Sequence, residues 1–285
     1  MTIKNQFKTV ILLGLLTGIL LWIGSFWGQS GLLFALVFSI LMNFFAYWFS
    51  DKIALAIYRA KHVTEEEAPK LYRIVREVSH LAKIPMPKVY IIPSNILNAF
   101  ATGRGKNHSA VAATQGILDA LNDDELKGVI AHEVSHIKNS DILIQSVAAT
   151  IAGVIGYIAM IARWGAIFGG FGGRDRRGGS GIELLILAIL TPILATIIRL
   201  AISRSREYLA DESGAKLLHN GYGLANALEK LEKGAQQMPL RPTSATETTA
   251  HMMIVSPFRG GGLVTLFSTH PDVKSRVKRL RSMNF

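Results

Sequence analysis

Residues 122–138 read Asn-Asp-Asp-Glu-Leu-Lys-Gly-Val-Ile-Ala-His-Glu-Val-Ser-His-Ile-Lys, and the other parts of the chain are best interpreted from this segment. Asn122 followed by Glu125 is a capping box, which marks the start of a helix. Apolar residues recur behind it at helical spacing: Leu126, Val129 and Ile130. We therefore expect a well-capped helix that carries His132 and His136 in its second half.

The spacing of these two histidines suits a metal site. Four residues turn an α-helix by about 400°, so both imidazoles project from one face and can share a tetrahedral metal ion. Glu133 lies about 100° round the helix from His132, where it can take a proton from a metal-bound water. The same pattern occurs in unrelated chains, so a structural or accidental origin is the alternative.

A third ligand is available in the segment Arg206-Glu207-Tyr-Leu-Ala-Asp211. Glu207 and Asp211 are also four residues apart and share a helix face. One of them can bind the metal while the other orients a ligating imidazole. The alternative is a solvated acidic face that pairs with Arg204 or Lys216.

Long apolar runs surround these motifs. The 285 residues are 49% hydrophobic and only 18% charged, which argues against a purely soluble enzyme because soluble domains average about 25% charged residues. Four stretches approach the roughly 20 apolar residues that cross a bilayer: Thr9–Trp27, Leu32–Phe49, Ile142–Ile161 and Ile182–Ile202. The first run is too long for a typical signal peptide, and a second follows it at once, so we expect a hairpin rather than a cleaved leader.

The apolar runs divide the chain into four parts. Residues 1–50 are expected to form an N-terminal transmembrane hairpin, and 142–202 a second hairpin that either spans the membrane or is re-entrant. The polar parts, 51–141 and 203–285, are expected to bury one core together. Alternating apolar residues predict strands near 88–92, 99–102 and 109–113, so the expected fold is a mainly α membrane protein with an α+β domain and a small sheet.

The two sets of candidate ligands lie at matching distances from the second hairpin. His136 precedes Ile142 by six residues, and Glu207 follows Ile202 by five. At about 1.5 Å rise per residue, both sets lie roughly 8–9 Å beyond the membrane end of their helices. If the two segments form a hairpin, the ligands meet at one height.

The distribution of charge predicts orientation and partners. The chain has a net charge of +11 and no cysteine, which excludes a thiolate metal site. Lysines and arginines flank the outer ends of the first two apolar runs, so the positive-inside rule places both termini and both polar parts in the cytoplasm. The arginines of the loop near Gly172 disagree with this arrangement, which a re-entrant hairpin would explain. We expect anionic lipid at the basic flanks and no nucleic acid partner.

Taken together, the motifs resemble the HtpX family of bacterial membrane zinc metalloproteases, distant relatives of the CAAX prenyl proteases. The resemblance rests on the two N-terminal apolar runs and on four motifs: Asn98-Ala-Phe-Ala-Thr-Gly-Arg104, His132–His136, Arg206–Asp211 and Phe267-Ser-Thr-His270-Pro271. It implies a zincin-like protease domain in a protein of the inner membrane, and the positive-inside rule places that domain on the cytoplasmic side. It also implies that misfolded or damaged membrane proteins are the substrates.

The resemblance further assigns roles to residues. It implies one Zn²⁺ per chain bound by His132, His136 and Glu207, with Glu133 as the catalytic base. Asp211 is then expected to support His132 from behind. The remaining expectations are His270 as a stabiliser of the oxyanion, or alternatively a turn histidine, and substrate contacts from Asn98 and Arg276.

Two other functions fit parts of the pattern. An intramembrane metalloprotease would bury its histidines inside a membrane span, whereas His132 and His136 lie on a charged helix that ends before Ile142. A non-catalytic metal-binding membrane scaffold would have no use for Glu133.

Overall fold

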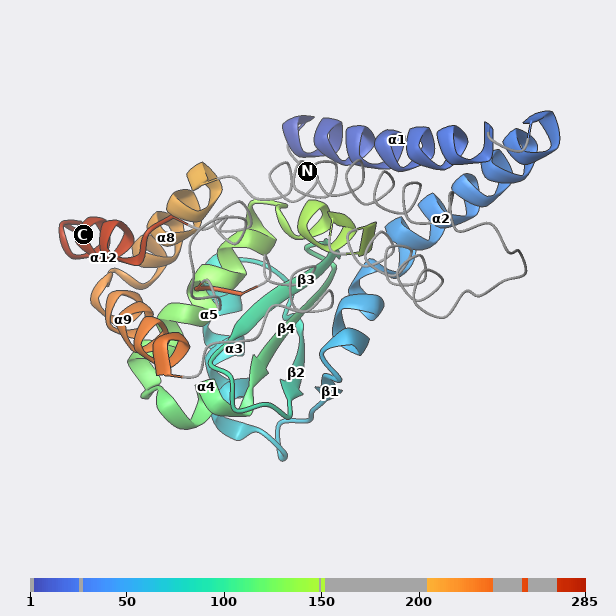
Figure 1. Cartoon of the computed structure of the whole chain (residues 1–285). Helices are drawn as coiled ribbons and strands as arrows, with labels where there is room; N and C mark the ends of the chain where they lie inside the picture. Colours follow the sequence, from blue (N-terminus) through green and yellow to red (C-terminus); the bar gives the residue numbers. More distant parts are fainter. Residues whose placement is uncertain (1–2, 26–27, 149, 152–203, 238–252, 256–270) are drawn as a thin grey trace.

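The computed structural model describes residues 3–25, 28–148, 150–151, 204–237, 253–255 and 271–285 (Figure 1). Its helices are α1 (Ile3–Ser25), α2 (Gly28–Ile57), α3 (Pro69–Ala82), α4 (Gln115–Ala120), α5 (Asp123–Lys138), α8 (Arg204–Leu218), α9 (Tyr222–Gln237) and α12 (Val273–Arg281). Its strands are β1 (Lys61–His62), β2 (Lys88–Ile92), β3 (Ala99–Gly105) and β4 (His108–Thr114). A mostly helical chain with a small mixed sheet confirms the expected α+β character.

The strands form one sheet in the order β1-β2-β4-β3, so β3 lies at an edge. β2 and β4 are parallel, whereas β1 with β2 and β3 with β4 are antiparallel. Side chains alternate between the two faces of a strand, and β3 follows this rule. Ala99 and Ala101 join the core beneath α5, while Phe100 packs with Ala54 and Leu55 at the end of α2.

Helix α5 lies at the centre of the domain, where it contacts α3, α8, α9 and β3 (Figure 1). The capping box that starts it is confirmed: Asn122 Oδ1 accepts from the Glu125 N–H at 2.9 Å, and Glu125 Oε2 accepts from the Asn122 N–H at 3.0 Å. A Cβ at Gly128 would lie 2.5 Å from the backbone nitrogen of Leu224 in α9. Glycine at this position therefore lets α9 pack directly on the backbone of α5.

Both polar parts of the chain contribute to the core around α5. The same buried cluster contains Leu71 and Ile130 from the first part and Ala215, Leu228 and Val277 from the second. The metal motif on α5 and the acidic motif on α8 are thus held in one packed unit.

The first polar part begins with a turn before its first helix. Thr64 and Glu67 have the spacing of a capping box, but α3 begins at Pro69, and the Thr64 N–H donates to Glu67 Oε2 at 2.8 Å within the preceding turn. Pro69 explains why the helix begins there, because proline fits the first turn of a helix and disfavours helical geometry in the residue before it.

Helices α1 and α2 pack against each other as a hairpin, and the C-terminal end of α2 reaches the sheet (Figure 1). Within the described residues one helix, α2, is long and apolar enough to cross a membrane, whereas the apolar part of α1, Thr9–Trp22, is shorter. The Asn43 side-chain amide donates to Thr17 Oγ1 at 2.8 Å and ties the two helices together. Large apolar side chains on α2 are exposed, including Phe34 at 72%.

Helix α2 is longer than the predicted span Leu32–Phe49. It begins at Gly28, so residues 28–31, which lie between the two predicted apolar runs, form its first turn, and it continues to Ile57 because Ala54 and Leu55 pack on the sheet. Residues 142–148 are helical and contribute to a cluster with Leu16 and Leu20 of α1. The rest of the third predicted span and the whole of the fourth lie outside the described residues.

Candidate metal centre

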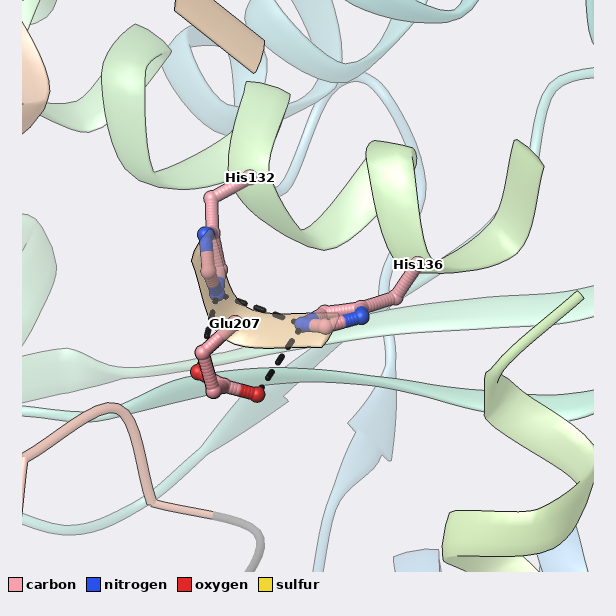
Figure 2. Close-up of side chains that lie close together, drawn as sticks. All are labelled: His132, His136 and Glu207. Carbon is pink, nitrogen blue, oxygen red and sulfur yellow. Dashed lines mark hydrogen bonds and ion pairs between the residues drawn. The ribbon is translucent and has the colours of Figure 1, made fainter. Parts of the chain in front are cut away.

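Three candidate ligands from two helices converge inside the domain. His132 and His136 project from α5 toward Glu207 on α8 (Figure 2). The two Nε2 atoms are 3.2 Å apart, and each lies 3.6 Å from a different carboxylate oxygen of Glu207. All three side chains are buried, and one donor atom from each lies within 4.8 Å of the others. In the parts of the chain that are described, no other group of three His, Asp or Glu residues meets this criterion.

The chemistry of these donors fits a metal ion. The two imidazole nitrogens face each other at hydrogen-bonding distance, and a buried carboxylate lies beside them. These three groups can all donate lone pairs to one metal ion. Two histidines and one carboxylate are also one of the ligand sets of catalytic zinc sites, which keep a fourth position for water. The geometry therefore favours Glu207, rather than Asp211, as the third ligand.

Carboxylates behind the histidines fix their orientation. Nδ1 of His132 lies 2.9 Å from Asp211 Oδ1, and Nδ1 of His136 lies 3.3 Å from Asp141 Oδ2. Such contacts turn each Nε2 toward the metal position and raise the basicity of the ring. Asp211 lies where the sequence predicted it. Asp141 was missed, although an acidic residue just after the end of a histidine-bearing helix was a usable signal.

Arg276 completes this arrangement from α12. It is fully buried, and its Nε and Nη2 donate to the two oxygens of Asp211 at 2.8 and 2.7 Å. Its Nη1 donates to the Ile254 carbonyl at 3.1 Å and lies 3.9 Å from Glu207 Oε2. Arg276 thus lies behind the ligands and braces them, and its predicted contact with substrate stays a prediction.

The protonation of the site follows from these contacts. Burial alone would raise the pKa of Asp211, but the charge and hydrogen bonds of Arg276 outweigh it and lower the pKa of Asp211 to about 2. Burial likewise opposes the charged form of His132, yet hydrogen bonds to Asp211 and Glu207 raise the pKa of His132 to about 10. Asp211 and Glu207 thus favour positive charge at His132, a preference that also suits a bound cation.

Glu133 points to the edge strand rather than to the ligand cluster. Its Oε2 accepts a hydrogen bond from the Ala101 N–H of β3 at 2.9 Å. Burial raises the pKa of Glu133, and the neighbouring histidines partly oppose that rise. A carboxylate next to the ligands but outside them is the position expected for a general base.

Two further predicted residues have different outcomes. Asn98 is buried just before β3, where its Oδ1 accepts from the Ile254 N–H at 3.2 Å. Its contact with substrate stays a prediction. His270 lies outside the described residues.

Comparison with known proteins now identifies the family. Residues 65–284 match the description "Peptidase family M48". The chain belongs to peptidase family M48. Its relatives include three proteins named "Protease HtpX homolog". Those from Syntrophobacter fumaroxidans and Pyrococcus furiosus are each 51% identical, and the one from Persephonella marina is 52% identical. The matches cover 98%, 97% and 98% of this chain and 99%, 95% and 97% of the relatives.

A solved structure shares the fold of this M48 peptidase. The crystal structure of S. mikatae Ste24p is similar with a TM-score of 0.52 at 18% sequence identity. The match covers 98% of this chain but 66% of that chain, slightly less than two thirds of its length.

Family membership and the histidine–glutamate cluster together establish the enzyme class. The protein is a membrane-bound metalloprotease of family M48, and among its described helices α2 is long and apolar enough to cross a membrane. A non-catalytic scaffold is thereby excluded.

Proposed function

We propose that this M48 peptidase is a zinc-dependent endopeptidase of the bacterial inner membrane that cleaves misfolded or damaged membrane proteins. The observation that carries the proposal is the buried group of His132, His136 and Glu207 with Glu133 directly beside it. The names of the relatives support the protease activity, and the ligand set favours zinc over harder metals, which prefer all-oxygen sites.

The side chains of the site have separate roles in the proposed reaction. A bound zinc ion would supply a polarised water and a Lewis acid for the peptide carbonyl. Glu133 would take the proton of that water and later deliver it to the leaving amine. Asp211 and Asp141 hold the imidazoles in place, so the ligand geometry is preorganised before substrate arrives.

Strand β3 supports an endopeptidase rather than a terminus-specific enzyme. An edge strand can bind an extended peptide through main-chain hydrogen bonds, which place little restriction on side chains. Ala101 of this strand contacts Glu133 directly, so a peptide paired with β3 would pass beside the catalytic base.

The position of α5 favours chemistry outside the bilayer. His132 and His136 are packed among α3, α8, α9 and the sheet, whereas the exposed apolar residues of α2 belong to the hairpin. An intramembrane metalloprotease, the alternative, would place its ligands on a lipid-facing helix bundle. We therefore propose an active site on the cytoplasmic side of the membrane.

Anionic lipid is the proposed partner at the junction between hairpin and domain. The Arg104 guanidinium lies 4.5 Å from the ring centre of Trp48, and the Lys52 ammonium lies 5.2 Å from that of Phe49. Aromatic residues beside cations are typical of the membrane interface, where lipid phosphates attract basic side chains. The catalytic part 51–141 carries a net charge of only +1, so no nucleic acid partner is proposed.

Metal removal tests the proposed activity. Purified protein in detergent should cleave casein, and 1,10-phenanthroline should reduce the rate at least tenfold, of the order expected when a catalytic metal is withdrawn. Added Zn²⁺ should restore the rate, while the non-chelating isomer 1,7-phenanthroline should have no effect. Cleavage that persists at full rate in metal-free protein would contradict the proposal.

The proposed topology has four spans with both termini in the cytoplasm. A reporter fused near Gly172, in the loop between the third and fourth predicted spans, should then report the periplasmic side. Gly172 lies outside the described residues. A cytoplasmic signal from this position would rule out four full crossings and favour a re-entrant second hairpin, without moving the metal site.

A further inference from the structure

Ile254 belongs to a short segment, residues 253–255, that packs into the core around α5. Its N–H donates to Asn98 Oδ1 at 3.2 Å, and its carbonyl accepts from Arg276 Nη1 at 3.1 Å. Ile254 is only 4% exposed, and a buried peptide group requires hydrogen-bond partners. Two side chains from distant parts of the sequence therefore hold this one residue in place.

Asn98 is itself fixed by the end of the neighbouring strand. Its N–H donates to Thr114 Oγ1 at 3.1 Å, and its carbonyl accepts from both the N–H and the hydroxyl of Thr114 at 2.9 Å. Thr114 is the last residue of β4 and the N-cap of α4. The backbone of Asn98 is thus tied to a rigid part of the domain, and its side-chain oxygen is presented to Ile254 from a fixed position.

On the other side of Ile254, Arg276 Nη1 lies between two acceptors. It donates to the Ile254 carbonyl, and it lies 3.9 Å from Oε2 of the metal ligand Glu207. Arg276 is fully buried, and a buried donor without an acceptor is unfavourable. If the Ile254 carbonyl moved away, Nη1 would therefore pair with the charged oxygen of Glu207, which a small movement of the guanidinium would bring into hydrogen-bonding distance.

A pair between Arg276 and Glu207 would compete with metal binding. The hydrogen bond would occupy lone pairs that the metal needs, and it would bring the positive guanidinium closer to a cation. The Ile254 carbonyl prevents this by satisfying Nη1, while Nε and Nη2 remain on Asp211. The position of Ile254 thus decides how available Glu207 is to the metal.

We propose that Asn98 is a positioning residue for the metal centre, which holds the Ile254 peptide where its carbonyl keeps Arg276 away from Glu207. The inference rests on the proposed metal centre of His132, His136 and Glu207. It gives segment 253–255 a role in metal affinity, and it gives Asn98 a role that does not depend on contact with substrate.

Zinc affinity tests the role of Asn98. Asn98→Leu keeps the approximate size of the side chain but removes the acceptor for the Ile254 N–H. Competition with a fluorescent chelator should show an affinity for Zn²⁺ about tenfold below wild type, the lower end of the effect of groups that support metal ligands. An unchanged affinity together with a raised KM for casein would overturn the inference and make Asn98 a substrate contact.

Thr102→Val is the matched control for loss of a buried hydrogen bond. Thr102 lies on the same strand and is fully buried, and its Oγ1 lies 2.7 Å from Ser146 Oγ, which is not part of the Asn98–Ile254–Arg276 chain. This variant should bind Zn²⁺ with wild-type affinity. An equal loss of affinity in Thr102→Val and Asn98→Leu would show a general effect of destabilisation and contradict a specific role for Asn98.

A double-mutant cycle tests the route through Arg276. In an Arg276→Met background no guanidinium remains to pair with Glu207, so adding Asn98→Leu should lower the affinity for Zn²⁺ no further. Residues that act through one another give such non-additive effects. A second, full tenfold loss in the double variant would show that Asn98 does not act through Arg276, and the inference would fail.

Hydrogen exchange of the wild-type protein in detergent tests the same coupling without any variant. Linkage requires that Zn²⁺ favours the docked Ile254 by the factor by which docking favours Zn²⁺. Zn²⁺ should therefore slow exchange of the Ile254 amide about tenfold more than exchange of the Val63 amide, which is bonded to the Val89 carbonyl at the opposite edge of the sheet. Equal slowing at both amides would overturn the inference, whereas wild-type protein that binds no Zn²⁺ would refute the proposed metal centre itself.

Discussion

Glu133→Gln is expected to abolish proteolysis while leaving metal binding intact. Glutamine keeps the size of the side chain and can still face the Ala101 N–H, but it cannot take a proton from water. Loss of a general base typically costs 10²–10⁴-fold, and here the same group also serves the leaving amine, so we expect a decrease of at least about 10³-fold in kcat. The measurement pairs casein cleavage in detergent with metal content by atomic absorption.

Two variants make this result specific. His132→Ala removes a ligand and should lose both activity and metal, which separates the ligand role from the base role. Glu229→Gln makes the same chemical change at an exposed ion pair with Arg281 and should retain wild-type activity. Glu133→Gln enzyme that still cleaves casein at the wild-type rate would show that the base is another group.

The helix that carries the ligands was predictable because its determinants are local. The capping box at Asn122, the spacing of His132 and His136, and the acidic pair on α8 each lie within one or two turns. Local patterns of this kind fix both the type of element and the face of each side chain. The strands near 88–92, 99–102 and 109–113 followed from the same kind of information.

Features that depend on partners distant in sequence were not predictable. Helix α2 continues beyond its apolar run because Ala54 and Leu55 pack against the sheet, and the local sequence does not indicate that contact. The two-residue strand β1 exists only through its pairing with β2. Asn98 and Ile254 are 156 residues apart in the sequence, so the hydrogen bond between them is visible only in three dimensions.

Arg276 illustrates how the same limit affects a functional residue. Its position after the His270-Pro271 motif suggested a substrate contact, yet it lies fully buried against Asp211. A guanidinium can bridge two carboxylates and a carbonyl at once, so the sequence alone does not say which partners it takes. The contacts favour a role in holding the metal ligands.

Arg276→Met is therefore expected to weaken the metal site and the fold together. Breaking a buried ion pair by removing one partner costs about 3–5 kcal/mol, because Asp211 is left without compensation beside Glu207. Loss of support behind a ligating histidine lowers metal affinity by about 10–100-fold. The measurements are thermal unfolding in detergent, with and without Zn²⁺, and competition for Zn²⁺ with a fluorescent chelator.

The double variant Arg276→Met with Asp211→Asn separates charge from packing. Asparagine is neutral and can still face His132, so removing both charges should recover much of the stability lost in Arg276→Met, since apolar replacement of a whole buried pair is often nearly neutral. Arg276→Lys should fall between wild type and methionine, because lysine keeps the charge but not the two-pronged contact with Asp211. If the single methionine variant unfolds at the wild-type temperature and binds Zn²⁺ with unchanged affinity, Arg276 does not brace the ligands. Its predicted contact with substrate would then be the role to test.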